Sequence, residues 1–104
     1  MFLAFRRAKD GRACNRRAAL LERWPASGAD LEALLGVLHA SMKLTDLRAI
    51  PQLHIDLAER DDRVEVKIEY RAVGVRAIAT DSSGSAVDHP DLVCGMIITE
   101  IEGA

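Results

Sequence analysis

The sequence predicts an α+β domain in which two helices pack on one face of an antiparallel sheet of about four strands. Hydrophobic residues recur with a helical period in the first half of the chain and with a period of two from Gln52 onward. The composition, 49% hydrophobic and 29% charged over 104 residues, is typical of a globular protein and of a single domain over residues 1–104. With only 4% aromatic residues, its core must be mostly aliphatic.

The N-terminal segment is predicted to contain a short strand and the first helix. Residues 2–6 fit a short strand, which would be a fifth in the sheet, and Lys9-Asp10-Gly11 is a turn signal. Residues 13–24 are predicted to form a helix that ends before Pro25. Its apolar side chains share one side, and the opposite side carries a basic row made of Arg12, Arg16 and Arg23.

A second helix is predicted over residues 28–43. Ser27 and Asp30 together resemble a capping box in which a short carboxylate replaces the usual glutamate. Apolar residues then recur at one-turn spacing: Leu31, Leu34, Leu35, Leu38 and Met42. This stripe is the side that we expect to face the sheet.

Residues 52–71 predict a β-hairpin that turns at Asp61-Asp62. A turn centred there sets Asp56 opposite Lys67 and Ile55 opposite Ile68, so one register keeps the apolar side chains inside and the charged ones in water. Because Asp-Asp is a poor two-residue turn, we expect a four-residue loop.

The rest of the sheet is less determined. Gly74 fits either a tight turn or a bulge, so residues 63–80 form either two strands or one bent strand. The last strand is predicted over residues 92–101 and is apolar on both faces, as in a central strand or one covered by a partner. We therefore expect self-association as a dimer through Val93 or Ile97, whichever faces outward.

Charge is distributed unevenly along the chain. The first 24 residues carry seven basic and two acidic side chains, a net charge of +5, whereas residues 25–104 carry seven and fourteen, a net charge of −7. This asymmetry indicates an anionic partner, or a basic segment that folds back onto an acidic body or a second subunit. The candidate anion- or partner-binding residues are Arg12, Arg16 and Arg23, since guanidinium groups bind phosphates and carboxylates bidentately. Nucleic acid is weakly supported, because no nucleic-acid motif accompanies the row, and the row also fits an ordinary solvated helix face balanced by the acidic sheet.

The sequence contains no complete catalytic or metal motif. Residues 81–92 begin like a calcium loop but lack its glycine and its final glutamate. Ser83, His89 and Asp91 supply the residue types of a catalytic triad without a Gly-x-Ser-x-Gly elbow. The three histidines lack metal-site spacing, so we expect no metal and no other cofactor.

Cysteine usage and hydropathy favour the cytoplasm. Cys14 and Cys94 are far apart with no Cys-x-x-Cys, so no disulfide framework is expected, and Cys14 is expected to be a core residue rather than a reactive thiol. The longest apolar run, residues 92–98, is far short of the roughly 20 residues of a membrane-spanning helix, so we expect no membrane partner. The N-terminus reverses the order of a secretory signal peptide, and an organellar transit peptide is a minor alternative.

Two functional classes remain open. The favoured one is a non-catalytic binding or assembly module. The alternative is a small enzyme of thioesterase, isomerase or dehydratase type, since the order of strand, helices and four strands is compatible with a hot-dog or cystatin-like layout. An enclosed apolar pocket would favour the enzyme if its mouth carried Asp30, Glu32, His39 or His54, and a filled core would favour the module.

Overall fold

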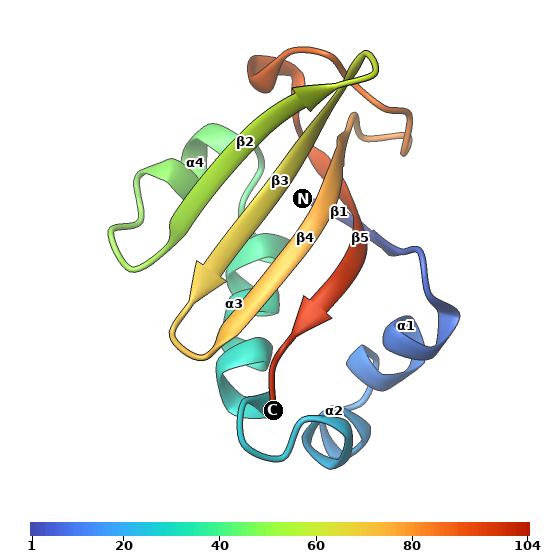
Figure 1. Ribbon diagram of the computed structural model, residues 1–104, viewed down its shortest axis with the longest axis vertical. Coiled ribbons are helices and arrows are strands. Elements are labelled where there is room, and N and C mark those ends of the chain that lie inside the picture. The colour runs from blue at the N-terminus through green and yellow to red at the C-terminus, as the bar shows by residue number, and fades with distance from the viewer.

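The computed structural model describes residues 1–104, apart from the side chain of Asp91, and confirms the α+β class (Figure 1). The described chain forms one five-stranded sheet, so the short N-terminal strand is present as its fifth member. In chain order the elements are β1 (Phe2–Phe5), α1 (Ala8–Cys14), α2 (Arg17–Arg23), α3 (Gly28–Ala40), α4 (Leu44–Arg48), β2 (His54–Arg60), β3 (Arg63–Tyr70), β4 (Val73–Thr80), the 3-10 turn η1 (Pro90–Leu92) and β5 (Gly95–Glu102).

The strands lie in the order β1-β5-β4-β3-β2. Strands β2 to β5 form an antiparallel meander, and β1 pairs parallel with β5. β5 is thus an interior strand, one of the two situations expected from its two apolar faces. Residues 63–80 form two strands that turn at Arg71, whose φ is +52°, and a register shift falls instead between Arg76 and Ala77 where β4 meets β5.

The predicted hairpin register is confirmed: Asp56 pairs with Lys67 and Ile55 with Ile68. The expected four-residue loop is wrong, because Arg60 pairs directly with Arg63 across a two-residue turn. Asp61 and Asp62 have φ values of 51° and 61°, the left-handed pair of a type I′ turn. That turn matches the twist of the flanking strands, and aspartate is one of the few non-glycine residues that adopts this region.

The single helix predicted over residues 13–24 is wrong, because the chain breaks into α1 and α2 at Arg16, whose backbone is extended. The predicted turn at residues 9–11 lies inside α1. In one continuous helix, residues 10 and 23 would be about 20 Å apart at 1.5 Å per residue. The break folds α2 back, so that Arg23 donates a 2.6 Å hydrogen bond to the buried carboxylate of Asp10.

The second predicted helix is shorter than expected, because α3 ends at Ala40 and α4 follows as a separate turn. Four leucines of the stripe are buried as predicted, whereas Met42 lies beyond α3 and is 76% exposed. Ser27 does not cap α3. Its hydroxyl donates instead to the carbonyl of Ala104, which attaches the C-terminus to the start of α3.

The helices leave one face of the sheet uncovered. Figure 1 shows α3 and α4 behind the sheet, with α1 and α2 beyond its β5 side. Most of the large fully buried side chains come from α3 and α4 and from alternate positions of the strands: Leu31, Leu34, Leu38, Leu44, Leu47, Val64, Ile68, Val75, Met96 and Ile98. In the described part of the chain, no helix has the length and apolar character needed to cross a membrane.

Candidate functional site

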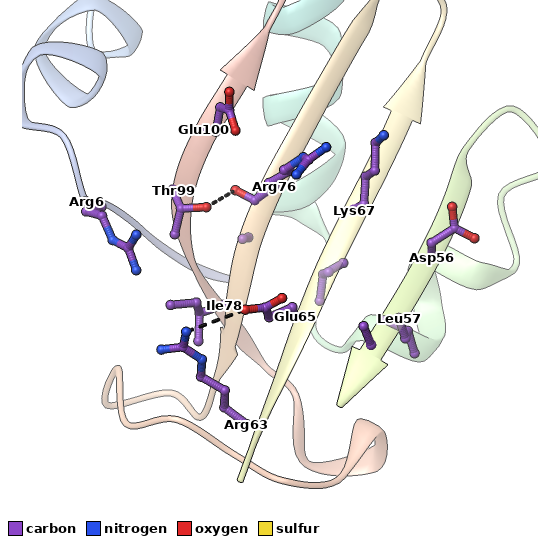
Figure 2. A pocket seen from close by; sticks show the side chains of 13 residues that line it. Arg6, Asp56, Leu57, Arg63, Glu65, Lys67, Arg76, Ile78, Thr99 and Glu100 are labelled. Carbon is purple, nitrogen blue, oxygen red and sulfur yellow. Dashed lines mark hydrogen bonds and ion pairs between the residues drawn. The ribbon is translucent and has the colours of Figure 1, made fainter. Parts of the chain in front are cut away.

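The uncovered sheet face carries the charged rows that the hairpin register predicts. A hollow of about 410 Å³ lies over its centre, and Figure 2 shows Arg6 and Arg63 reaching toward Ile78 there. Most of the charges on this face already have partners: Lys67 lies 3.2 Å from Glu69, Arg76 lies 3.3 Å from Glu102, and Arg63 lies 3.5 Å from Glu65. The hollow is therefore largely neutralised, which makes it a weak site for a strongly charged ligand.

The chain around α1 is different, because most of its cations have no counter-ion among the described side chains. Five exposed basic side chains lie farther than 4.0 Å from any described carboxylate, and we call them the basic surface: Arg6, Arg7, Lys9, Arg12 and Arg16. They come from the segment that follows β1, from α1 and from the break before α2. Figure 1 places α1 at one side of the molecule, away from β2.

The two other cations of the N-terminal segment are paired. Arg17 lies 3.0 Å from Glu32 of α3, an exposed pair. Arg23 is bonded to Asp10, which is only 3% exposed, and its guanidinium also lies 5.0 Å from the ring centre of Trp24. Of seven N-terminal cations, only Arg17 is neutralised by the acidic body of the protein. The expectation that the basic segment folds back onto that body therefore has little support.

The structure brings together only part of the predicted basic row. Arg12 lies in the last turn of α1 and Arg16 in the break, and both are exposed and form no ion pair with any carboxylate that the structure describes. Arg23 donates its hydrogen bond to Asp10, so its guanidinium group stabilises the fold and is not available to bind a partner. Sequence reasoning missed Arg6, Arg7 and Lys9 as members of the surface, although the charge count of the segment already included them.

The two residues proposed for self-association have different environments. Val93 is 0% exposed and bonds through its backbone carbonyl to the N–H of Leu44, so it is unavailable to a partner. Ile97 points to the uncovered face, because its neighbours Met96 and Ile98 are buried on the helix side. There it is half-buried and lies between Ala4 of β1 and Ile78 of β4. The strand pairing thus occupies much of the apolar surface that suggested a partner.

A second hollow, of about 340 Å³, lies where β1, α1 and α3 meet. Glu32, His39 and Cys14 line it. Glu32 and His39 are two of the four residues that the enzyme alternative names for the mouth of a pocket. Asp30 and His54 do not line it, since Asp30 lies 3.6 Å from Arg71 and His54 lies 3.6 Å from Asp56. The polar residues that line this hollow are therefore Cys14, Asn15, His39 and the ion pair of Glu32 with Arg17.

Cys14 is not activated in this hollow. Burial raises the pKa of its thiol to about 11, and the Asp10 carboxylate acts in the same direction against the opposing effect of Arg23. A thiol with this pKa remains protonated at neutral pH, and the thiolate is the reactive form. This agrees with the expectation that Cys14 is a core residue rather than a nucleophile.

We predict that the alkylation rate of Cys14 by iodoacetamide rises about tenfold per pH unit from pH 8 to pH 10. An exposed cysteine would level off near its ordinary pKa of roughly 8.5. Mass spectrometry of the Cys14 peptide measures the rate. Because the folded-state pKa is raised, the contribution of Cys14 to stability is full below that ordinary value and is lost as pH rises toward 11. Circular dichroism must therefore show folded protein at each pH, and a plateau near pH 9 would contradict the buried environment.

The polar loop after β4 has a structural explanation. The Asp81 carboxylate accepts hydrogen bonds from the Ser83 hydroxyl at 2.7 Å and from the N–H groups of Ser83 and Ser85 at 2.8 and 3.0 Å. These bonds, led by that of the Ser83 hydroxyl, lower the pKa of Asp81. Ser83 is thus bonded within its own turn, and the side chain of Asp91 lies outside the described residues. Among the described side chains, no group of three or more His, Cys, Asp or Glu could hold a metal ion.

Comparison of the chain with protein families, with curated proteins and with solved structures finds no match.

Proposed function

We propose that the protein is a non-catalytic binding module that holds a polyanionic partner on the basic surface. The single observation that carries the proposal is that Arg6, Arg7, Lys9, Arg12 and Arg16 are exposed and lack counter-ions among the described residues. Unpaired cations gathered on one segment attract a partner with several regularly spaced negative charges, such as phosphates or sulfates. Two free thiols, Cys14 and Cys94, fit the cytoplasm as the location of this binding.

The charge of the remaining chain would help to orient such a partner toward the basic surface. Residues 25–104 carry a net charge of −7, so they repel a polyanion while residues 1–24, with a net charge of +5, attract it. Binding of this kind releases counter-ions from the partner and weakens as salt rises. For duplex DNA, five phosphate contacts correspond to a slope of about −4.5 in a plot of log K against log salt concentration.

We predict that replacing Arg7, Arg12 and Arg16 together by glutamine weakens binding to a labelled DNA duplex by at least roughly tenfold at low salt and makes the salt slope shallower by about 3. All three side chains are exposed, so the variant should fold normally. Fluorescence anisotropy at several salt concentrations measures both quantities, and heparin in place of DNA tests whether the surface accepts any polyanion.

The matched control replaces three exposed arginines outside the basic surface, Arg48, Arg71 and Arg76, by glutamine. It changes the net charge of the protein by the same amount, so a similar loss in both variants would mean that only total charge matters. Absence of salt-dependent binding of the wild-type protein to both DNA and heparin would refute the proposal.

One observation supports the enzyme alternative, namely the hollow lined by Glu32 and His39. Its volume of about 340 Å³ is at the lower end for small-molecule sites. With Cys14 protonated and Glu32 paired with Arg17, only His39 offers acid–base chemistry there. A lone exposed imidazole is a weaker basis for a function than five unpaired cations, so we place binding before catalysis.

A further inference from the structure

Strand β2 is an edge of the sheet that lacks cover. It pairs with β3 on one side, and no described strand pairs with its other side. None of its seven residues is buried, and Ile55 and Leu57 are only half-buried although they point to the helix side. Strands β3, β4 and β5, in contrast, each contain fully buried residues.

The free edge of β2 is also regular. All seven of its residues pair with β3 without a register shift, and its sequence contains no proline, glycine or lysine. Natural sheets usually protect an exposed edge with proline, with charged side chains or with a bulge, because unpaired N–H and C=O groups are a template for another strand. β2 carries the charged residues Asp56, Glu59 and Arg60, but no proline or bulge interrupts its backbone. A regular edge of this length is therefore suited to pair with a further strand.

The tight turn determines which backbone groups are free. In a two-residue hairpin the closing pair, here Arg60 and Arg63, exchanges hydrogen bonds. Because the direction of the backbone groups alternates along a strand, those of Arg60, Ala58 and Asp56 point toward β3. The N–H and C=O groups of Ile55, Leu57 and Glu59 consequently point outward from the sheet.

We propose that β2 pairs antiparallel with β2 of a second copy of this chain, about a two-fold axis at Leu57, which joins two sheets into one of ten strands. In a symmetric antiparallel pair, one residue must lie opposite its own copy. With Leu57 there, the backbone groups of Ile55 bond those of Glu59 in the second copy, and Leu57 bonds its own copy. All outward groups of the three residues are then satisfied.

Charge complementarity selects a second copy over an unrelated strand. Asp56 lies in the N-terminal half of β2 and Arg60 in the C-terminal half, so antiparallel pairing sets each Asp56 diagonal to Arg60 of the second copy, within reach of a long side chain. The other diagonal neighbour of Asp56 is Asp56 of the second copy, whose shorter side chain reaches less far. Arg60 is held only loosely within its own chain, 3.8 Å from Glu65. An axis at Ala58 would instead set the outward backbone groups of Ile55 opposite Asp61 of the turn, outside the strand, and leave them without a partner.

The proposed interface is separate from the basic surface. β1, which leads into α1, is the opposite edge of the sheet from β2. The dimer therefore leaves both basic surfaces free at its two outer ends. Two such surfaces on one particle would raise the avidity for a long polyanion, although the dimer itself does not depend on polyanion binding.

Glu59→Pro and Glu59→Ala are the matched pair of variants that test the interface. Both remove the same exposed side chain, and only proline removes the outward N–H, which is not bonded to β3. At roughly 100 µM, a concentration that populates even a weak dimer, light scattering should give twice the mass of one chain for wild type and Glu59→Ala. Glu59→Pro should give the mass of one chain with an unchanged circular dichroism spectrum.

Cysteine cross-linking tests the register. Leu57→Cys should form a dimer on mild oxidation, because opposed Cα atoms of a hydrogen-bonded pair lie about 5.5 Å apart. Ala58→Cys should not, since its copies would be about 8 Å apart in this register. The wild-type protein, whose Cys14 and Cys94 are free, is the control for cross-links through native cysteines.

Each other outcome refutes the proposal. A monomeric wild-type protein excludes the dimer. A dimer that persists in folded Glu59→Pro but is lost in Ile97→Asp would place the interface on the uncovered sheet face instead. Cross-linking by Ala58→Cys but not by Leu57→Cys would show that the two-fold axis lies at Ala58.

Discussion

Ile68→Ala is expected to lower the free energy of unfolding by roughly 2–5 kcal/mol, as for other truncations of a buried aliphatic side chain. Ile68 is 0% exposed, lies in the middle of β3 and pairs with Ile55 on one side and Val75 on the other. Truncation leaves a cavity under α3 and α4 that neighbouring strands cannot fill without shifting. Urea denaturation followed by circular dichroism measures the effect.

The matched control is Lys67→Ala, one residue away on the same strand. Lys67 points to the uncovered face and pairs with Glu69 at 3.2 Å, with about a third of its side chain exposed. Such a surface pair contributes at most about 1 kcal/mol, so the loss should be several times smaller than for Ile68. Equal losses from the two substitutions would contradict the assignment of inner and outer faces.

The hairpin register was predictable because alternate residues of a strand face opposite sides of the sheet, so the alternation of apolar and charged residues determines which residues are buried. A shift of one residue would expose Ile55 and Ile68 and bury Asp56 and Lys67, at a cost far above that of any turn type. Even the unfavourable Asp61-Asp62 turn is therefore forced into the tight conformation. The turn type was predicted wrongly because it was judged from local preference alone.

The break between α1 and α2 could not be predicted from local preference. Alanine, arginine and leucine all favour helix, so residues 13–24 appear continuous. What separates α1 from α2 is a contact between Asp10 and Arg23, together with the packing of α2 against α3. Both are tertiary interactions that no local pattern reveals. The same applies to β5, whose neighbour β1 comes from the other end of the chain and packs Ala4 against Ile97.

The candidate site was predictable as a region but not as a set of residues. The charge count located a basic N-terminal segment, and counting alone could not tell which cations would remain free. That depends on where the nearby carboxylates lie after folding: Asp10 forms an ion pair with Arg23, and Glu32 forms one with Arg17. The predicted row of Arg12, Arg16 and Arg23 therefore combined two surface residues with one that stabilises the fold.

Arg23→Ala is expected to lower the free energy of unfolding by about 1–3 kcal/mol, because it leaves the buried carboxylate of Asp10 without the partner of its part-buried ion pair. Asp10 is 3% exposed and accepts the 2.6 Å bond from Arg23. Arg12→Ala is the control, since Arg12 is exposed and unpaired, and its loss should change stability by no more than about 0.5 kcal/mol. Equal effects of the two would mean that Arg23 is as free as Arg12.

A double-mutant cycle with Asp10→Ala separates the ion pair from the contact of Arg23 with Trp24, which lies 5.0 Å away and is worth about 0.5–1 kcal/mol where exposed. If the buried charge causes the loss, removing Asp10 as well should recover part of it, so that the double variant is more stable than Arg23→Ala alone. If the loss of stability in the double variant equals the sum of the losses in the two single variants, packing on Trp24 and not charge holds α2 against α1.

In either case Arg23→Ala should leave polyanion affinity nearly unchanged under conditions where the protein is folded, whereas Arg12→Ala should weaken it without affecting stability. Loss of stability in Arg23→Ala and loss of affinity in Arg12→Ala would establish that two arginines of the same predicted row have different roles, one in the fold and one in binding.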